Sequence, residues 1–308
     1  MQVSFIIPLY NCLPLTRACV ASLQATLPAG LEHEIILVDD GSNDGTREWL
    51  QTLSTPFRTL LNERNLGYAG ANNRAAAHAR GECLFFLNND LVLLPGWFEP
   101  MHAILRTRPE AGLVGNVQLH AGSGAIDHTG VYFNHQGKPV HDTTRPWPAR
   151  LSGCRSVAAM TAACFGIRRD LWNRLEGFDP EFINGCEDID LCLRARAAGN
   201  RNYVSLRSRV RHHISQSPGR KQHDEQNTLR LFLRWRDEIA RLAAHDWSRR
   251  FIELHWDQSF VFDDALGRCA LGYWLHLLPT PPARILAGVQ QSITRELARW
   301  SALLPGRA

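Results

Sequence analysis

The sequence lacks the features of a membrane span, a zinc knuckle and a disulfide framework. No apolar run approaches the roughly 18–20 residues that a helix needs to cross a bilayer. The eight cysteines are irregularly spaced with no Cys-x-x-Cys pair, so reduced and mostly buried thiols are expected. Met1 runs straight into an apolar segment, without the basic region and cleavage site of a signal peptide. A formal net charge of +4 is too small to indicate a nucleic-acid partner. We therefore expect a soluble protein, or one held at most at a membrane surface.

Glycine-rich phosphate-binding loops are missing as well. A dinucleotide-binding fold needs Gly-x-Gly-x-x-Gly directly after its first strand, but residues 8–11 contain no glycine. Gly67 and Gly70 follow the third predicted strand with the wrong spacing, and the P-loop pattern is absent. A nucleotide bound by this chain would therefore be held by carboxylates and a metal ion rather than by a glycine-rich helix turn.

What the sequence does contain is an alternation of strands and helices. The 308 residues are enough for one large α/β domain with an appendage. Because strands that are apolar throughout and alternate with helices are typical of parallel sheets, we expect such a sheet with both faces covered. Its predicted strands are residues 3–7, 34–38, 57–61 and 84–87, and its predicted helices are residues 15–27, 43–53, 70–79 and 97–107. Residues 109–160 show no regular pattern, and the small apolar residues of 156–167 could line the floor of a pocket.

Polar side chains follow two of these strands at the point where each strand ends. Asp39 and Asp40 follow the second strand, and Asn88, Asn89 and Asp90 follow the fourth. Ligands of open α/β sheets bind outside the carboxyl ends of the strands, so these residues predict one site. A carboxylate beside two amides suits a hard divalent cation bound to a phosphate. An ordinary polar turn after the strand is the alternative.

Acidic residues open a predicted helix late in the chain. Glu187, Asp188 and Asp190 lie in its first turn, where the helix dipole stabilises ionised carboxylates by about 0.3–1 kcal/mol. Asp188 and Asp190 point to different sides of such a helix. One can act as the general base toward a sugar hydroxyl, while the other pairs with a basic neighbour such as Arg194. An acidic turn that serves only the helix dipole is the alternative.

The segment that follows is basic. Residues 207–221 contain five basic residues, no acid, and the pair His212 and His213. A histidine at a strand end could bind a metal ion, and the basic loop after it could cover a diphosphate; a solvated basic loop is the alternative. Helices predicted over residues 227–242, 248–254 and 283–304 carry Trp, Phe or Leu on one side and Arg on the other. Such helices pack on the domain or a second subunit, or lie on a membrane surface.

Five motifs, taken together and in this order, resemble family 2 glycosyltransferases of the GT-A fold. The similarity is closest to the rhamnosyltransferase-like and galactofuranosyltransferase-like members that build bacterial surface polysaccharides, and it covers roughly residues 1–220. The motifs are VSFIIPLYN at 3–11, VDDGSNDGT at 38–46, NLG with ANN at 65–73, FLNND at 86–90 and EDIDLCLR at 187–194. The resemblance implies a GT-A domain over residues 1–221, with a nucleotide-binding half to about 108 and an acceptor half after it, and a helical extension over 222–308.

The resemblance also implies roles for individual residues. Asp188 would be the catalytic base, and Asp90 the metal-binding carboxylate, with His212 rather than His213 as a further ligand. Asn88 replaces a carboxylate of many members, which lowers the affinity expected for metal without nucleotide. Glu187 and Thr161 are candidates on the acceptor side. The residues expected to hold the nucleotide sugar are Pro8 and Tyr10 beside the base, Asp39 on the pyrimidine edge, Asn65 and Asn72 near base and ribose, Asn88, Asn89, and Arg220 or Lys221 on the diphosphate.

The expected activity is therefore an inverting, Mg²⁺- or Mn²⁺-dependent transfer from a UDP- or dTDP-linked sugar. The acceptor would be a glycan or a lipid-linked glycan of the bacterial cell surface. The expected location is the cytoplasm, with peripheral contact of the C-terminal helices at the inner membrane face as an open alternative. Two other functions stay open: an inactive carbohydrate-binding or scaffold subunit, and a sugar nucleotidyltransferase, although the latter usually carries a glycine-rich basic loop after its first strand.

Overall fold

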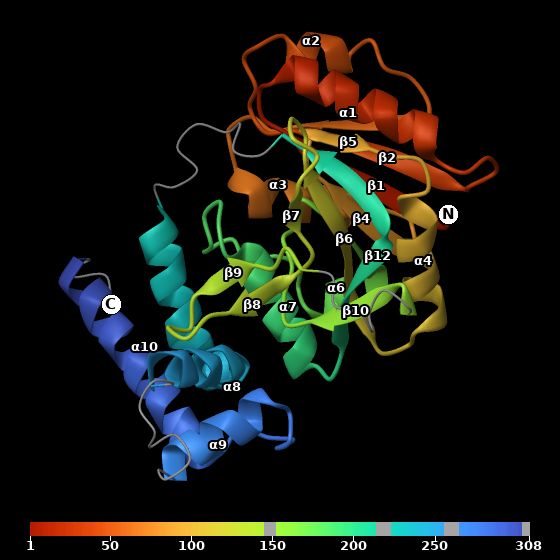
Figure 1. Cartoon of the computed structure of the whole chain (residues 1–308). Helices are drawn as coiled ribbons and strands as arrows, with labels where there is room; N and C mark the ends of the chain where they lie inside the picture. The colour runs from red at the N-terminus through yellow and green to blue at the C-terminus, as the bar shows by residue number, and fades with distance from the viewer. Residues whose placement is uncertain (145–151, 214–222, 256–264, 304–308) are drawn as a thin grey trace. The chain divides into compact units, whose positions relative to one another are not determined.

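The computed structural model describes residues 1–144, 152–213, 223–255 and 265–303 of the chain (Figure 1). The chain forms two compact units: Met1–Val131 with His141–His223, and Tyr132–Val140 with Asp224–Ala308. Arg220 and Lys221, expected on the diphosphate, lie outside the described residues.

The first unit contains the sheet and its covering helices. The strands are β1 Val3–Leu9, β2 His33–Asp39, β3 Phe57–Leu61, β4 Cys83–Leu87, β5 Leu91–Leu93, β6 Ala111–His120, β7 Ile126–His128, β10 Cys154–Val157, β11 Cys164–Arg168 and β12 Arg201–His212. The helices are α1 Leu13–Thr26, α2 Thr46–Leu50, α3 Gly67–His78, α4 Phe98–Thr107, α6 Arg169–Arg174 and α7 Glu187–Ala197. A separate two-stranded sheet, most of which belongs to the second unit, pairs β8 Val131–Phe133 with β9 Pro139–His141.

The main sheet has a parallel half and a mixed half. Its order is β10-β12-β6-β11-β4-β1-β2-β3, with β5 pairing β12 and β7 pairing β6. The strands β4, β1, β2 and β3 run parallel to one another, as predicted, whereas β11 is antiparallel to both β4 and β6. Since parallel strands end at the same edge, the polar residues after β2 and β4 come to one side of the sheet.

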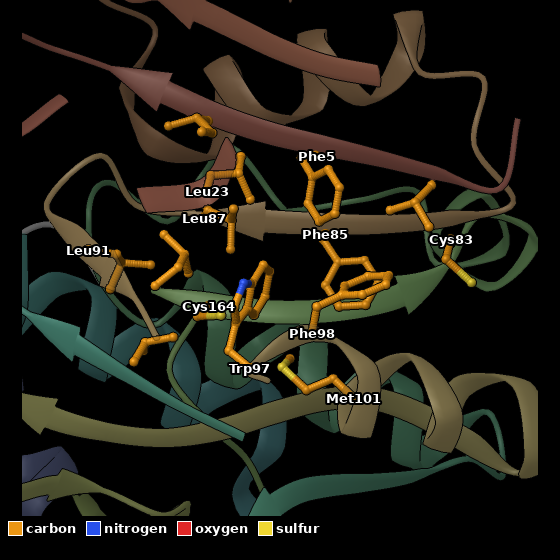
Figure 2. Packing of buried hydrophobic residues seen from close by; sticks show 14 of the residues in the cluster. Phe5, Leu23, Cys83, Phe85, Leu87, Leu91, Trp97, Phe98, Met101 and Cys164 are labelled. Carbon is orange, nitrogen blue, oxygen red and sulfur yellow. The ribbon is translucent and has the colours of Figure 1, made fainter. Parts of the chain in front are cut away.

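The core packs on both faces of the sheet. On one face, the ring of Phe5 lies 5.7 Å from that of Phe85 and 5.6 Å from that of Phe98 on α4 (Figure 2). On the other face, Phe86 stacks on Phe165 at 4.8 Å and on Trp172 of α6 at 4.4 Å. Phe85 and Phe86 are adjacent in β4, so their side chains point to opposite faces. Both faces of this inner strand are therefore buried, which explains its continuous apolar run.

The strands β6 and β12 lie in parts of the chain for which no strand bounds were predicted. Residues 109–160 were expected to be irregular, but β6 runs for ten residues within them. Its apolar run is interrupted by buried Asn116 and Gln118 and by two glycines, which removes the usual strand signature. In β12, Arg207, Arg209 and Arg211 are exposed while Ser208, Val210 and His212 are buried. This alternation is a half-buried strand, not only a basic loop.

The second unit is built mainly from α8 Asp224–His255, α9 Ala265–Trp274 and α10 Ala283–Leu303. The predicted break at residues 243–247 is wrong, because α8 continues through them and is kinked at Trp235 instead. Residues 243 and 244 are alanines, strong helix formers, and both are fully buried. The apolar side of α10 is buried as well, with Trp300 packed 4.8 Å from Phe232 of α8.

All eight cysteines are free thiols, and five of them are buried, as expected. Within the described ranges, no helix combines the length and the apolar character that crossing a membrane requires.

Candidate active site

The carboxyl ends of neighbouring strands are joined by backbone hydrogen bonds. Asp40 N donates to Leu9 O at 2.8 Å, which links β2 to β1. Asn62 N donates to Asp39 O at 2.8 Å, which links β3 to β2. These bonds bring the residues that follow the strands to one edge, the arrangement that the sequence predicted.

Asp39 is fully buried at this edge and already has partners within the protein. Its Oδ2 lies 2.7 Å from Nε of Arg47 on α2, and its Oδ1 accepts a hydrogen bond from Ser42 N at 3.2 Å. Arg47 also donates to the carbonyl of Asn62. Contact of Asp39 with a nucleobase stays a prediction, and any such contact would have to share these oxygens.

Asp40 was not assigned a role from the sequence, yet it shapes the same edge. Its Oδ1 accepts hydrogen bonds from Asn62 Nδ2 at 2.6 Å and from Leu66 N at 2.8 Å. Burial raises the pKa of Asp40, and these hydrogen bonds counter that rise. Asp40 therefore fixes the segment that leads into α3, and a second carboxylate at the strand end was the only signal for it.

The two asparagines expected near base and ribose have different surroundings. Asn65 is exposed, and its Oδ1 accepts a hydrogen bond from the backbone of Gly67, whose φ is +74°. Asn72 is fully buried in α3, where its Nδ2 donates to Tyr68 O at 2.9 Å. Tyr10, expected beside the base, is 44% exposed, and Pro8 is half-buried in β1.

Asp90 and His212 meet at the end of two strands that are distant in sequence. Antiparallel pairing places Leu91 of β5 opposite His212 of β12, and His213 N donates to Asp90 O at 3.0 Å. As a result, His212 Nε2 lies 3.2 Å from Asp90 Oδ1. Both side chains are largely buried, with 6% and 12% exposed. The structure thus brings together the two residues predicted to bind a metal.

Asn88 and Asn89 connect this pair to the rest of the site. Asn89 Nδ2 donates to Thr16 Oγ1 of α1 at 2.9 Å. Asn88 N donates to Ala163 O at 2.8 Å, which joins the end of β4 to the segment 161–163 before β11.

The same short segment holds Asp188, the predicted base. Asp188 Oδ2 accepts a hydrogen bond from Ala162 N at 3.0 Å, and its Oδ1 accepts one from Ile189 N at 2.8 Å. Asp188 is half-buried at the N-terminus of α7, next to the buried Glu187. Thr161 is half-buried, and its N–H lies 3.5 Å from Nε2 of His128.

Residues 161–163 take part in this site through their backbone. That they line a pocket floor stays a prediction; their backbone atoms bind Asn88, Asp188 and Tyr68, whose hydroxyl donates to Ala162 O at 2.9 Å. Tyr68 and His128 were not singled out. Burial lowers the pKa of His128 to about 3, so its imidazole is neutral at pH 7. No local pattern marks a residue that acts through its backbone.

Asp190 faces away from this segment and pairs with Arg194, as predicted. Arg194 Nε lies 2.7 Å from Asp190 Oδ2, and Asp190 is fully buried. Arg194 also donates to the carbonyls of Leu175 and Gly177. The pair anchors α7 and leaves Asp188 as the carboxylate of this turn that meets the segment 161–163.

Removing this buried anchor should destabilise the fold. Asp190→Asn leaves Arg194 without its anionic partner, so we expect a loss of about 3 kcal/mol in the free energy of unfolding. Asp170→Asn is a matched control, because Asp170 and Arg174 form the same i,i+4 pair at an exposed position with 63% of Asp170 accessible. That change should cost less than about 0.5 kcal/mol. Equal losses in urea unfolding of the two variants would contradict the anchoring role.

Asp90 and His212 fit a divalent cation, but only as part of a ligand set. Asp90 Oδ1 is buried, accepts no hydrogen bond within the part of the chain that the structure describes, and lies 3.2 Å from His212 Nε2, so one cation could contact both atoms. In those same ranges, no group of three or more His, Cys, Asp or Glu side chains could hold a metal ion. Mg²⁺ is usually bound by one or two carboxylates together with substrate phosphates and water. Two protein ligands would therefore suffice if a diphosphate supplied the others.

The comparison with protein families decides which family this arrangement belongs to. The model of glycosyl transferase family 2 matches residues 4–172. The chain belongs to this family. The match begins in β1 and ends in α6, so it includes the strand ends that carry Asp39 and Asp90 and the segment 161–163.

Curated relatives of this family 2 chain include proteins of bacterial polysaccharide synthesis. The chain is 33% identical over 263 residues to protein y4gI of Sinorhizobium fredii, covering 80% of this chain and 28% of that protein. It is 32% identical to the O-antigen biosynthesis protein RfbC of Myxococcus xanthus, covering 70% and 18%. It is 27% identical to a Mycobacterium tuberculosis N-acetylglucosaminyl-diphospho-decaprenol L-rhamnosyltransferase, covering 68% and 71%. The chain thus spans under a third of y4gI and RfbC.

Solved structures show that the fold is GT-A. GalNAc-T7, crystallised with UDP, GalNAc and Mn²⁺, matches 81% of this chain and 50% of its own with a TM-score of 0.65 and 20% identity. S. aureus TarS 1–349 in complex with UDP-GlcNAc matches 98% of this chain and 91% of its own with a TM-score of 0.61 and 14% identity. The predicted fold class, a mostly parallel sheet with covering helices, is confirmed.

Proposed function

We propose that this family 2 member is an inverting, metal-dependent glycosyltransferase that uses a UDP- or dTDP-linked sugar. Its acceptor would be a glycan or lipid-linked glycan of the bacterial cell surface. RfbC and the rhamnosyltransferase support the polysaccharide setting by their names, and TarS and GalNAc-T7 support a uridine nucleotide and Mn²⁺ by their complexes. A rhamnosyl donor is one candidate within this proposal.

The observation that carries the proposal is the short connection between the Asp90–His212 pair and Asp188. Asn88, two residues before Asp90, bonds to Ala163, and the adjacent Ala162 bonds to Asp188. A donor diphosphate at the pair and an acceptor hydroxyl at Asp188 would therefore be held by one continuous piece of backbone. Such fixed positioning of two reactants can supply much of a rate enhancement.

Each residue would have a distinct part in transfer. Asp90 and His212 would hold Mg²⁺ or Mn²⁺, which stabilises negative charge on a departing diphosphate. Asp188 would take the proton of the acceptor hydroxyl as its oxygen attacks the anomeric carbon from the face opposite the leaving group. That attack inverts the anomeric configuration. Glu187 and Thr161, adjacent to this carboxylate and to its backbone donor, would contact the acceptor.

The remaining nucleotide contacts keep the assignment made from the sequence. Tyr10 and Asn65 are exposed at the sheet edge and would meet the base and ribose together with Pro8, Asp39 and Asn72. Asn88 and Asn89 would lie near ribose or phosphate oxygens. Arg220 and Lys221 would cover the diphosphate. Peripheral membrane contact of the C-terminal helices stays a prediction.

Thermal unfolding with nucleotides tests the proposal directly. The protein is heated with UDP, dTDP, GDP or CMP, each with Mn²⁺ or with EDTA. A nucleotide present at 100 times its dissociation constant should stabilise the fold by about 2.7 kcal/mol. We expect this shift for UDP or dTDP with Mn²⁺, and little shift for Mn²⁺ alone because the protein provides only two ligands. Absence of any nucleotide shift would favour a non-catalytic scaffold, and release of pyrophosphate from a nucleoside triphosphate would favour a nucleotidyltransferase.

A further inference from the structure

We propose that Tyr68 is a positioning residue that sets the orientation of Asp188 through the peptide groups of Ala162. Tyr68 Oη donates to Ala162 O at 2.9 Å, and Ala162 N donates to Asp188 Oδ2 at 3.0 Å. The two bonds use the carbonyl and the N–H of one residue. Loss of the Tyr68 hydroxyl would therefore free Ala162 to rotate, and this rotation would move the N–H that binds the Asp188 carboxylate. This inference rests on the proposed role of Asp188 as base.

Tyr68 is itself held from several directions. Its backbone N–H donates to Asn184 Oδ1 at 3.1 Å, in the loop that leads into α7. Its ring packs 5.6 Å from that of Phe178. Five residues further along α3, Asn73 binds the backbone of Phe178 twice, through Nδ2 to O at 2.7 Å and through Oδ1 from N at 2.9 Å. The first two turns of α3 thus form a frame for the segment 178–188.

The electrostatic surroundings agree with this geometry. Burial and the negative charges of Glu187 and Asp188 raise the pKa of Tyr68 well above its usual value. The hydroxyl is therefore protonated at neutral pH and can donate its hydrogen bond to Ala162 O. Tyr68 is a positioning residue rather than a second acid or base, because its proton is committed to a backbone carbonyl.

The frame also connects the segment of the NLG–ANN motif to the loop that precedes the EDID motif. The first motif opens α3 and was expected to contact only the nucleotide. In the structure its Tyr68 and Asn73 hold the loop before α7, which carries the second motif. The donor side and the acceptor side would thus be set by one helix, so the geometry of Asp188 depends on α3 as well as on α7.

Tyr68→Phe tests this inference, because it removes only the hydroxyl and keeps the ring against Phe178. Hydrogen exchange followed by mass spectrometry reports on the peptide containing Ala162, and it needs neither donor nor acceptor. Loss of one hydrogen bond changes the equilibrium constant for local opening of the backbone by about threefold to tenfold. We expect exchange of the Ala162 peptide to accelerate by about that factor. Unchanged exchange would overturn the inference.

A matched control and a kinetic readout separate positioning from general stability. Tyr203→Phe also removes a hydroxyl that donates at 2.9 Å, but to Glu110, and it should leave the Ala162 peptide unchanged. Transfer is assayed as nucleotide release from the donor that gives the largest thermal shift. In this assay we expect Tyr68→Phe to lower kcat by about threefold to tenfold and to leave the KM for the donor unchanged. Equal kcat in Tyr68→Phe and wild type would overturn the inference. If Asp188→Asn kept full activity, the assignment of Asp188 as base would be wrong. The exchange experiment on Tyr68→Phe would still test whether the Tyr68 hydroxyl holds Ala162.

Discussion

Asp188→Asn is expected to lower the transfer rate by about 10²–10⁴-fold, the usual contribution of a general base. The amide cannot accept the acceptor proton, yet it can keep one of the hydrogen bonds from Ala162 N and Ile189 N. The free energy of unfolding should therefore change by no more than about 1 kcal/mol. Donor binding should be retained, because Asp90 and His212 are untouched.

The measurement is nucleotide release from the donor that stabilises the protein best, followed by titration of the same donor in thermal unfolding. Asp170→Asn, at an exposed ion pair on α6, is the matched carboxylate-to-amide control and should behave as wild type. Near-wild-type turnover of Asp188→Asn would show that another group takes the proton. A lost nucleotide shift in this variant would mean that its effect reaches the donor site instead.

Asp90→Asn should remove the metal-dependent part of nucleotide binding. The change replaces the anionic oxygen that lies 3.2 Å from His212 by a neutral amide of the same size. Suppose that the nucleotide is present at 100 times the wild-type dissociation constant, which stabilises the wild type by about 2.7 kcal/mol. A 100-fold loss of affinity would then leave about 0.4 kcal/mol at the same concentration.

The measurement is thermal unfolding of Asp90→Asn with UDP or dTDP. If metal-dependent binding is lost, the unfolding curve in Mn²⁺ coincides with the curve in EDTA. His212→Asn should give the same result, since the two side chains would share one cation. A full Mn²⁺-dependent shift in both variants would place the metal elsewhere. Loss of the shift in only one of them would mean that the residues do not act as a pair.

Local patterns predicted the N-terminal half of the sheet well, above all for β1, β2 and β4, whose residues are almost all buried. Residues 57–61 were predicted as a strand and form β3 with the same bounds. β1, β2 and β4 extend only slightly beyond their predicted ranges, because each is a continuous apolar run. The same reasoning missed β6, whose buried Asn116 and Gln118 break the apolar run.

In the helical extension, local patterns predicted the helices less completely. Two of its helices, α8 and α10, were recognised from their amphipathic pattern, whereas α9 was not predicted, and the break in α8 was placed at residues 243–247 instead of at Trp235. Asp246, inside that predicted break, accepts a hydrogen bond from His135 N at 2.8 Å. This turn thus contacts a residue 111 positions away in the chain, and no local pattern reports such a contact.

The sequence by itself determined the family, the order along the chain of the strands that carry the motifs, and the types of residue at the site. It also indicated that Asp188 and Asp190 serve different ends, because helical geometry separates neighbouring side chains. Only the tertiary structure decided that the predicted partner of Arg194, Asp190, is fully buried, that β5 pairs with β12 and so brings Asp90 to His212, and that Ala162 joins Tyr68 to Asp188. Strand pairing and backbone contacts depend on residues far apart in the chain, so the physical interactions that complete the site leave no mark in any single segment.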